Sequence, residues 1–148
     1  MRVSKMKTVR TAIFAALGLG AGLLAPIAAR ADATYYHEFG DRTGLRAVVT
    51  DMLKYILADD RIKAYFTNAN IPVLNASLTN QFCMLEGGPC QFDENMKTVH
   101  QSLGITQAAF NALAEDLQKS MNQHDIPLAA QNDLLGKLAP MEHDIVTK

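Results

Sequence analysis

Apolar residues recur along most of this chain at steps of three and four, which is the spacing of side chains on one face of an α-helix. The first clear stripe predicts a helix from Leu45 to Ala58, ended by Asp59-Asp60 and followed by a brief turn from Asp60 to Phe66. The inward residues of this helix are Leu45, Val48, Val49, Met52, Ile56 and Leu57. Strand-like alternation is absent throughout the sequence, so the pattern predicts an all-α fold.

A second helix is predicted to have Pro72 as its first residue and to run towards Glu86, where Gly87-Gly88-Pro89 ends it. Its inner side carries Leu74, Leu78, Phe82 and Leu85. After a loop, Asp93-Glu94 suits the positive start of a short helix that carries His100.

Two longer helices are predicted in the remainder of the chain. Thr106 is a suitable N-cap for the first, which has Phe110, Leu113, Leu117 and Met121 at helical spacing. Pro127 opens the last helix, and its inward residues are Leu134, Leu138, Met141 and Ile145. Taken alone, these stripes describe the core of a helical bundle and indicate no function.

Residues 1–31 have the three regions of a secretory signal peptide. The segment from Met1 to Arg10 holds basic residues and no acidic ones, and the segment from Ala12 to Leu24 is apolar. Ala29-Arg30-Ala31 then places small residues at the two positions that a signal peptidase reads. We expect cleavage after Ala31, a periplasmic or secreted protein, and a single domain over residues 32–148; an uncleaved membrane tether is the alternative.

The predicted mature part is acidic, with nine Lys and Arg against fifteen Asp and Glu and a formal net charge of −6. Nucleic acids and anionic membranes attract clustered positive charge, so this composition argues against both as partners. The 117 residues of this part are enough for one domain that buries about two thirds of its surface.

His100 is the most informative candidate for chemistry. It lies in the run Met96-Lys97-Thr98-Val99-His100, which Gly104 ends and Thr106 follows with a new helix start. By itself, a histidine one turn after a methionine is most often a structural side chain. Together with Ala64-Tyr65-Phe66 and Gly87-Gly88-Pro89, however, this segment resembles the group I truncated haemoglobins.

The resemblance extends from Tyr35 to about Val146 and implies a truncated globin, a two-over-two sandwich of helices around one haem b per chain. It implies that His100 is the proximal iron ligand and that Phe66 wedges against the porphyrin. The other haem contacts that we expect are Leu53, Leu74, Leu78, Gln81, Met96, Leu103, Phe110 and Leu113.

A neutral imidazole gives iron one strong nitrogen donor and leaves the opposite coordination position free for a diatomic gas, so we expect a pentacoordinate iron. The other ring nitrogen of His100 is expected to donate to the carbonyl one turn back, near Met96, which fixes the tautomer. The chain has no Cys-x-x-Cys-His motif, so covalent haem attachment of the c type is excluded.

The distal side departs from the family pattern. Many group I members carry a tyrosine and glutamines there as donors to bound oxygen, whereas the matching positions in this chain are Leu53, Leu74 and Leu78, with Gln81 as the nearest amide. Losing a charge-assisted hydrogen bond costs about 1.5 to 3 kcal/mol. We therefore expect a pocket that binds oxygen loosely and autoxidises readily, while NO and CO are affected much less.

Cys83 and Cys90 lie seven residues apart across the Gly87-Gly88-Pro89 loop. In an exported protein an even cysteine count favours a disulfide, although two buried thiols are the simpler alternative. A metal site made of these cysteines with His37, His124 or His143 has no recognised ligand spacing.

Three function classes follow from these expectations. The first is a haem protein that binds or transports diatomic gases such as oxygen, NO and CO. The second is a haem redox enzyme, an NO dioxygenase or a reductase of peroxide or nitrite, which needs an external reductase because the chain has no flavin or nicotinamide motif. The third is a haem-less helical module used for protein contacts.

Overall fold

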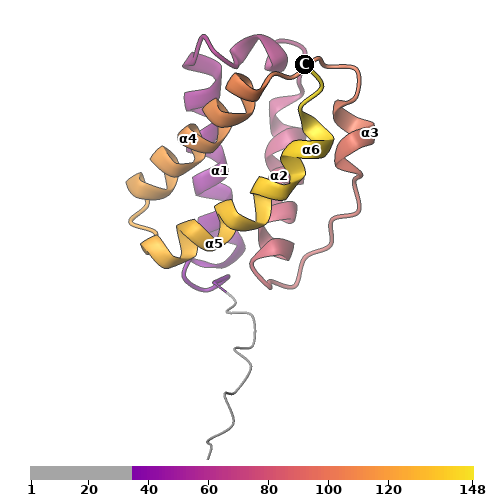
Figure 1. The fold of residues 1–148 in the computed structure, drawn as a ribbon. Coiled ribbons are helices and arrows are strands. Elements are labelled where there is room, and N and C mark those ends of the chain that lie inside the picture. The colour runs from indigo at the N-terminus through magenta and orange to yellow at the C-terminus, as the bar shows by residue number, and fades with distance from the viewer. Residues whose placement is uncertain (1–34) are drawn as a thin grey trace, which may run out of the picture. The chain divides into compact units, whose positions relative to one another are not determined.

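The computed structural model describes residues 35–148, so the predicted signal peptide and its cleavage after Ala31 lie outside the described residues. All regular elements in this range are helical, as the sequence pattern predicts (Figure 1). In chain order they are α1 (Asp41–Ala58), the 3-10 turn η1 (Lys63–Phe66), α2 (Ile71–Leu85), α3 (Met96–His100), α4 (Gln107–Gln123), α5 (Leu128–Leu138), the 3-10 turn η2 (Ala139–Met141) and α6 (Glu142–Ile145).

Helix α1 is the centre of the packing, because it lies against both α2 and α4, while α5 packs on α2 and on α4 (Figure 1). Short α3 lies beside α6 near the C-terminus. The buried core is formed mainly by α1 and α4 and includes Leu45, Val48, Val49, Met52, Leu53, Ile56, Ala112, Leu117 and Met121. This arrangement leaves α2, α3 and the C-terminal helices free to surround a cavity on one side of the core.

Helix α1 begins at Asp41, four residues before the predicted start. The prediction began too late because the first turn of the helix is polar and carries no apolar stripe. Gly40 precedes it in the left-handed region, with φ 72°. The predicted end at Ala58 is confirmed. Leu57 was expected to face inward, but its side chain is 44% exposed, and Leu53 is buried instead.

Side-chain caps define the starts of three helices. The predicted N-cap Thr106 is confirmed, since its hydroxyl accepts a hydrogen bond from the Ala109 amide of α4. Asn70 caps α2, which makes Pro72 its second residue rather than its first. Asn95 caps α3 through the Thr98 amide, and the acidic pair Asp93-Glu94 directly precedes this cap.

The predicted last helix from Pro127 to Ile145 is divided in the structure. Pro127 is the N-cap of α5, and this helix ends at Leu138. Pro140 then lies in η2, because proline has no amide hydrogen to continue the α-helical hydrogen bonds, and α6 follows. The bend turns Met141 and Ile145 towards the same cavity that Leu138 lines.

None of the helices within residues 35–148 is long and apolar enough to cross a membrane.

Candidate functional site

A cavity of about 590 Å³ lies between α2, α3, α4 and the C-terminal helices. Its wall is predominantly apolar, and every helix of the described residues contributes at least one residue to it. The predicted contact residues found on this wall are Phe66, Leu74, Leu78, Gln81, Met96, His100, Leu103, Phe110 and Leu113. A broad apolar cavity with one imidazole on its wall has the composition that a haem requires.

Leu53 is the predicted contact residue that the structure does not place on the cavity wall. Its side chain is 2% exposed and belongs to the core cluster, whereas its neighbour Met52 reaches the cavity. The resemblance correctly indicates that this part of α1 reaches the cavity, but the rotation of the helix about its axis decides that Met52, not Leu53, does so.

His100 is the last residue of α3 and lines the cavity. Its Nδ1 atom lies 2.7 Å from the carbonyl oxygen of Met96, one helical turn back, and this is the partner that the sequence analysis predicts. A carbonyl can only accept a hydrogen bond, so Nδ1 carries the proton. The other nitrogen, Nε2, therefore keeps its lone pair and is the one that can bind a metal.

Polar side chains on the cavity wall are few, and both hydroxyl groups among them already donate hydrogen bonds. The Tyr65 hydroxyl donates to the Gly104 carbonyl at 3.3 Å, and the Ser77 hydroxyl donates to the carboxylate of Glu94 at 2.9 Å. Gln81 is different, because its amide nitrogen lies 3.5 Å from a methionine sulfur on each of two neighbouring segments. Tyr65, Ser77 and Glu94 were missed as cavity residues, since none of them belongs to an apolar stripe.

Tyr55 lies near Leu53 in the sequence but does not serve the cavity. Its hydroxyl donates to the side-chain oxygen of Gln123, and the Lys119 ammonium lies 3.8 Å from the centre of its ring. The Tyr55 side chain thus lies away from the cavity wall.

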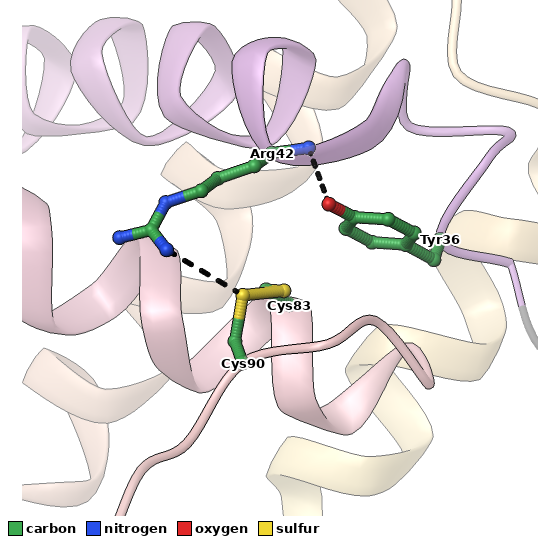
Figure 2. Close-up of a disulfide and its surroundings, with 4 residues drawn as sticks. All are labelled: Tyr36, Arg42, Cys83 and Cys90. Atoms are coloured by element: carbon green, nitrogen blue, oxygen red, sulfur yellow. Dashed lines mark hydrogen bonds between the residues drawn. A yellow bond between two sulfur atoms is a disulfide. The ribbon is translucent and has the colours of Figure 1, made fainter.

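The predicted disulfide between Cys83 and Cys90 is present in the structure, with Cα atoms 5.8 Å apart. It joins the end of α2 to the loop that leads to α3. Figure 2 shows the Tyr36 ring beside this bond, with its hydroxyl accepting from the Arg42 amide, while the Arg42 guanidinium reaches the sulfur of Cys90 at 3.9 Å. The pairing fixes one end of the segment that carries His100.

Two of the three histidines considered as metal ligands with these cysteines pair with carboxylate groups instead. His37 pairs with Asp41 at 2.6 Å, and His124 pairs with Asp51 at 2.8 Å. Within residues 35–148, histidine, cysteine and acidic side chains form no group of three or more that is suited to a metal ion.

A second, smaller hollow of about 350 Å³ lies at the surface between α1 and α4 and is strongly charged. Arg61 lines it and donates to Asp59 and to Glu115. Burial raises the pKa of the neighbouring Asp116 carboxyl, and the negative charge of Asp59 raises it further. This hollow is small and lined mostly by charged side chains, so the larger apolar cavity beside His100 is the candidate functional site.

Comparison with known proteins agrees with this geometry. The family model described as bacterial-like globin matches residues 34–147. The group 1 truncated hemoglobin GlbN of Mycolicibacterium paratuberculosis is 30% identical over 116 residues, which cover 78% of this chain and 85% of that protein. The group 1 truncated hemoglobin of Tetrahymena thermophila is 28% identical, over 77% of this chain and 93% of that protein.

Solved structures show the same fold. The crystal structure of truncated hemoglobin from Tetrahymena pyriformis in its Fe(III) form is similar with a TM-score of 0.73 and 26% identity, over 78% of this chain and 99% of that chain. The predicted fold class, an all-α truncated globin with a two-over-two arrangement, is thus confirmed. The chain belongs to the bacterial-like globin family and is one of its truncated haemoglobins, whose cofactor is one haem per chain.

Proposed function

We propose that this protein binds diatomic gases at a pentacoordinate haem iron held by His100. Haem, when bound, would supply an iron able to take up a gas. The observation that carries this proposal is the hydrogen bond from His100 Nδ1 to the Met96 carbonyl, because it leaves Nε2 unprotonated on a side chain that lines the cavity. Contact with the apolar wall would contribute to retention of the porphyrin.

The ligand role of His100 is tested by H100G in the haem-loaded full chain, with H37A as the control, since His37 is exposed and lies off the cavity wall. Absorption spectra of the ferric, ferrous and CO-bound protein are recorded. We expect H100G to lose the five-coordinate ferrous spectrum and to regain it when imidazole is added, while H37A keeps it. The proposal is wrong if H100G binds haem with an unchanged spectrum.

The distal wall supports weak retention of oxygen in particular. Leu74 and Leu78 line the cavity with hydrocarbon, and the hydroxyls of Tyr65 and Ser77 are occupied by other acceptors. Oxygen would become negatively polarised on binding, and the one amide donor on this wall, that of Gln81, lies against the sulfurs of Met96 and Met141. Lack of a strong donor lowers oxygen affinity by about tenfold to a hundredfold relative to a pocket with one. CO and NO carry less charge when bound and lose less.

Reduction of the iron requires a donor outside the described chain, and we propose a separate reductase for this role. If electrons arrive steadily, the same site serves the alternative function, a redox enzyme for NO, peroxide or nitrite. Turnover measured with a chemical reductant distinguishes that enzyme from a gas binder.

We further propose that the protein is exported and cleaved after Ala31. The Cys83–Cys90 disulfide supports this, because such bonds persist in oxidising compartments. Cell fractionation followed by N-terminal sequencing tests both points, and a cytoplasmic protein with residues 1–31 intact would refute them.

A further inference from the structure

Side chains of α2 make three links to the segment that brings His100 to the cavity, and α3 also lies beside α6. Residues 88–95 between Gly87 and α3 contain no helix, and α3 has five residues, too few to be stable alone. Three links from α2 reach this segment: the Cys83–Cys90 disulfide, the Ser77–Glu94 hydrogen bond, and the contact between Gln81 and Met96.

Gln81 has an unusual environment for an amide. Its side chain is 4% exposed and lies on the cavity wall, and its Nε2 group is 3.5 Å from the sulfur of Met96 and 3.5 Å from the sulfur of Met141. The amide nitrogen therefore lies against weak acceptors on two different segments. Because Gln81 is buried, these contacts help to hold the two methionine side chains in place.

Met96 connects this amide to the histidine. Its sulfur contacts Gln81, and its backbone carbonyl accepts from His100 Nδ1 at 2.7 Å. A methionine side chain has three rotatable bonds and is easily displaced, so the amide contact restricts the first residue of α3. A shift of that residue moves the acceptor of the His100 hydrogen bond.

We propose that Gln81 is a positioning residue that sets the orientation and basicity of His100 through Met96. The inference rests on the proposed role of His100 as iron ligand. A hydrogen bond from Nδ1 to a carbonyl increases the electron donation of the imidazole to iron. When the contact is lost, the carbonyl acceptor is less well held and His100 becomes a weaker donor.

The test uses the haem-loaded full chain and the iron–histidine stretching band of the ferrous, gas-free protein in resonance Raman spectra. Q81M removes the amide with little change in side-chain length, and M96L removes the sulfur in a swap that cores tolerate. We expect both variants to shift the band to lower frequency and to raise the ferric–ferrous midpoint potential. The double variant Q81M/M96L is expected to shift the band no further than the larger single effect, because both changes break one contact.

M141L is the matched comparison, since it breaks the other contact of the same amide and leaves Met96 in place. It is expected to shift the band less than M96L does. The inference is overturned if Q81M leaves the band in place, if M141L and M96L shift it equally, or if the double variant is additive. Failure of the proposed function has a different result: if His100 is not the iron ligand, H100G keeps the iron–histidine stretching band of the wild type.

Discussion

The carboxylate of Glu86 lies 3.5 Å from the ammonium group of Lys137, at the point where the end of α2 meets α5. Glu86 is fully buried, and its second carboxylate oxygen has no hydrogen-bond partner among the described residues. Burial raises the pKa of this carboxyl to about 7; Lys137 opposes the shift and Asp133 adds to it. The folded protein thus holds a proton on Glu86 that the unfolded chain releases near pH 4.5.

Stability is expected to fall as pH rises from about 4.5 to about 7, since the folded state binds more protons than the unfolded state in this window. The change from this one group amounts to about 3 kcal/mol in the free energy of unfolding. E86Q is expected to remove this part of the pH dependence. Urea unfolding between pH 4.5 and pH 8 measures it.

Glu38 provides the control for that experiment, because it is an exposed glutamate that does not contact Lys137 or Asp133. E38Q is expected to keep the wild-type slope of unfolding free energy against pH. An unchanged slope in E86Q would show that Glu86 stays ionised in the folded state.

A glutamine in place of Leu78 is expected to slow oxygen release from the haem-loaded protein. Leu78 lines the cavity on α2, so an amide there supplies the donor that the distal wall lacks. The added hydrogen bond should slow dissociation of oxygen by about tenfold or more, with a smaller effect on CO. Stopped-flow displacement of oxygen by CO measures this rate.

L57Q is the matched substitution, since Leu57 is 44% exposed and lies off the cavity wall. It introduces the same amide away from the cavity and should leave oxygen release near the wild-type rate. If oxygen dissociates equally slowly from L78Q and from the wild type, the distal pocket is not apolar.

Removing the disulfide is expected to cost about 2 to 3 kcal/mol of unfolding free energy, the amount that a short closed loop contributes. C83A/C90S suits this test because Cys83 is buried and Cys90 is partly exposed. Urea unfolding with and without a thiol reductant gives the comparison. The reductant should lower the stability of the wild type to that of the variant and leave the variant unchanged; a wild type insensitive to the reductant would indicate two free thiols.

The hydrophobic pattern predicted the helices, because burial repeats with the helical period, and the family resemblance supplied the two-over-two fold and most of the cavity wall, including Phe66 and His100. The prediction failed where the outcome depends on the rotation of a helix about its axis or on one missing backbone N–H group. Leu53 and Leu57 are both apolar residues of α1, and packing against α2 and α4 decides that Leu53 is the buried one. Pro140 divides the last helix even though the apolar stripe continues through it.

The contacts at the site that the sequence did not reveal are those between single side chains of different segments. The links from Gln81 to Met96 and from Ser77 to Glu94 join residues that are 15 and 17 positions apart and share no periodic signal. The hydrogen bond from His100 to Met96 was predictable, since four residues along a helix is one turn. Local geometry can thus be predicted from the sequence, whereas contacts between segments require the fold.

Two glycine-to-alanine substitutions are expected to have opposite effects on stability. At Gly88 a Cβ atom would lie 2.5 Å from the Tyr36 ring and 2.6 Å from the Cys83 sulfur. Neither neighbour can move freely, because the Tyr36 hydroxyl is hydrogen-bonded to the Arg42 amide and the sulfur is in the disulfide, as Figure 2 shows. G88A should therefore lower the unfolding free energy by about 1 to 3 kcal/mol, the usual cost of overpacking.

Gly136 lies inside α5, and no atom within 4 Å would meet a Cβ there. Alanine at this position reduces the freedom of the unfolded chain and has the higher helix propensity, so G136A should raise the unfolding free energy by about 0.5 to 1 kcal/mol. Urea denaturation of both variants under oxidising conditions measures the pair. If G88A is as stable as the wild type, the ring, the glycine and the disulfide are not closely packed, and the loop towards His100 is held less tightly than the structure indicates.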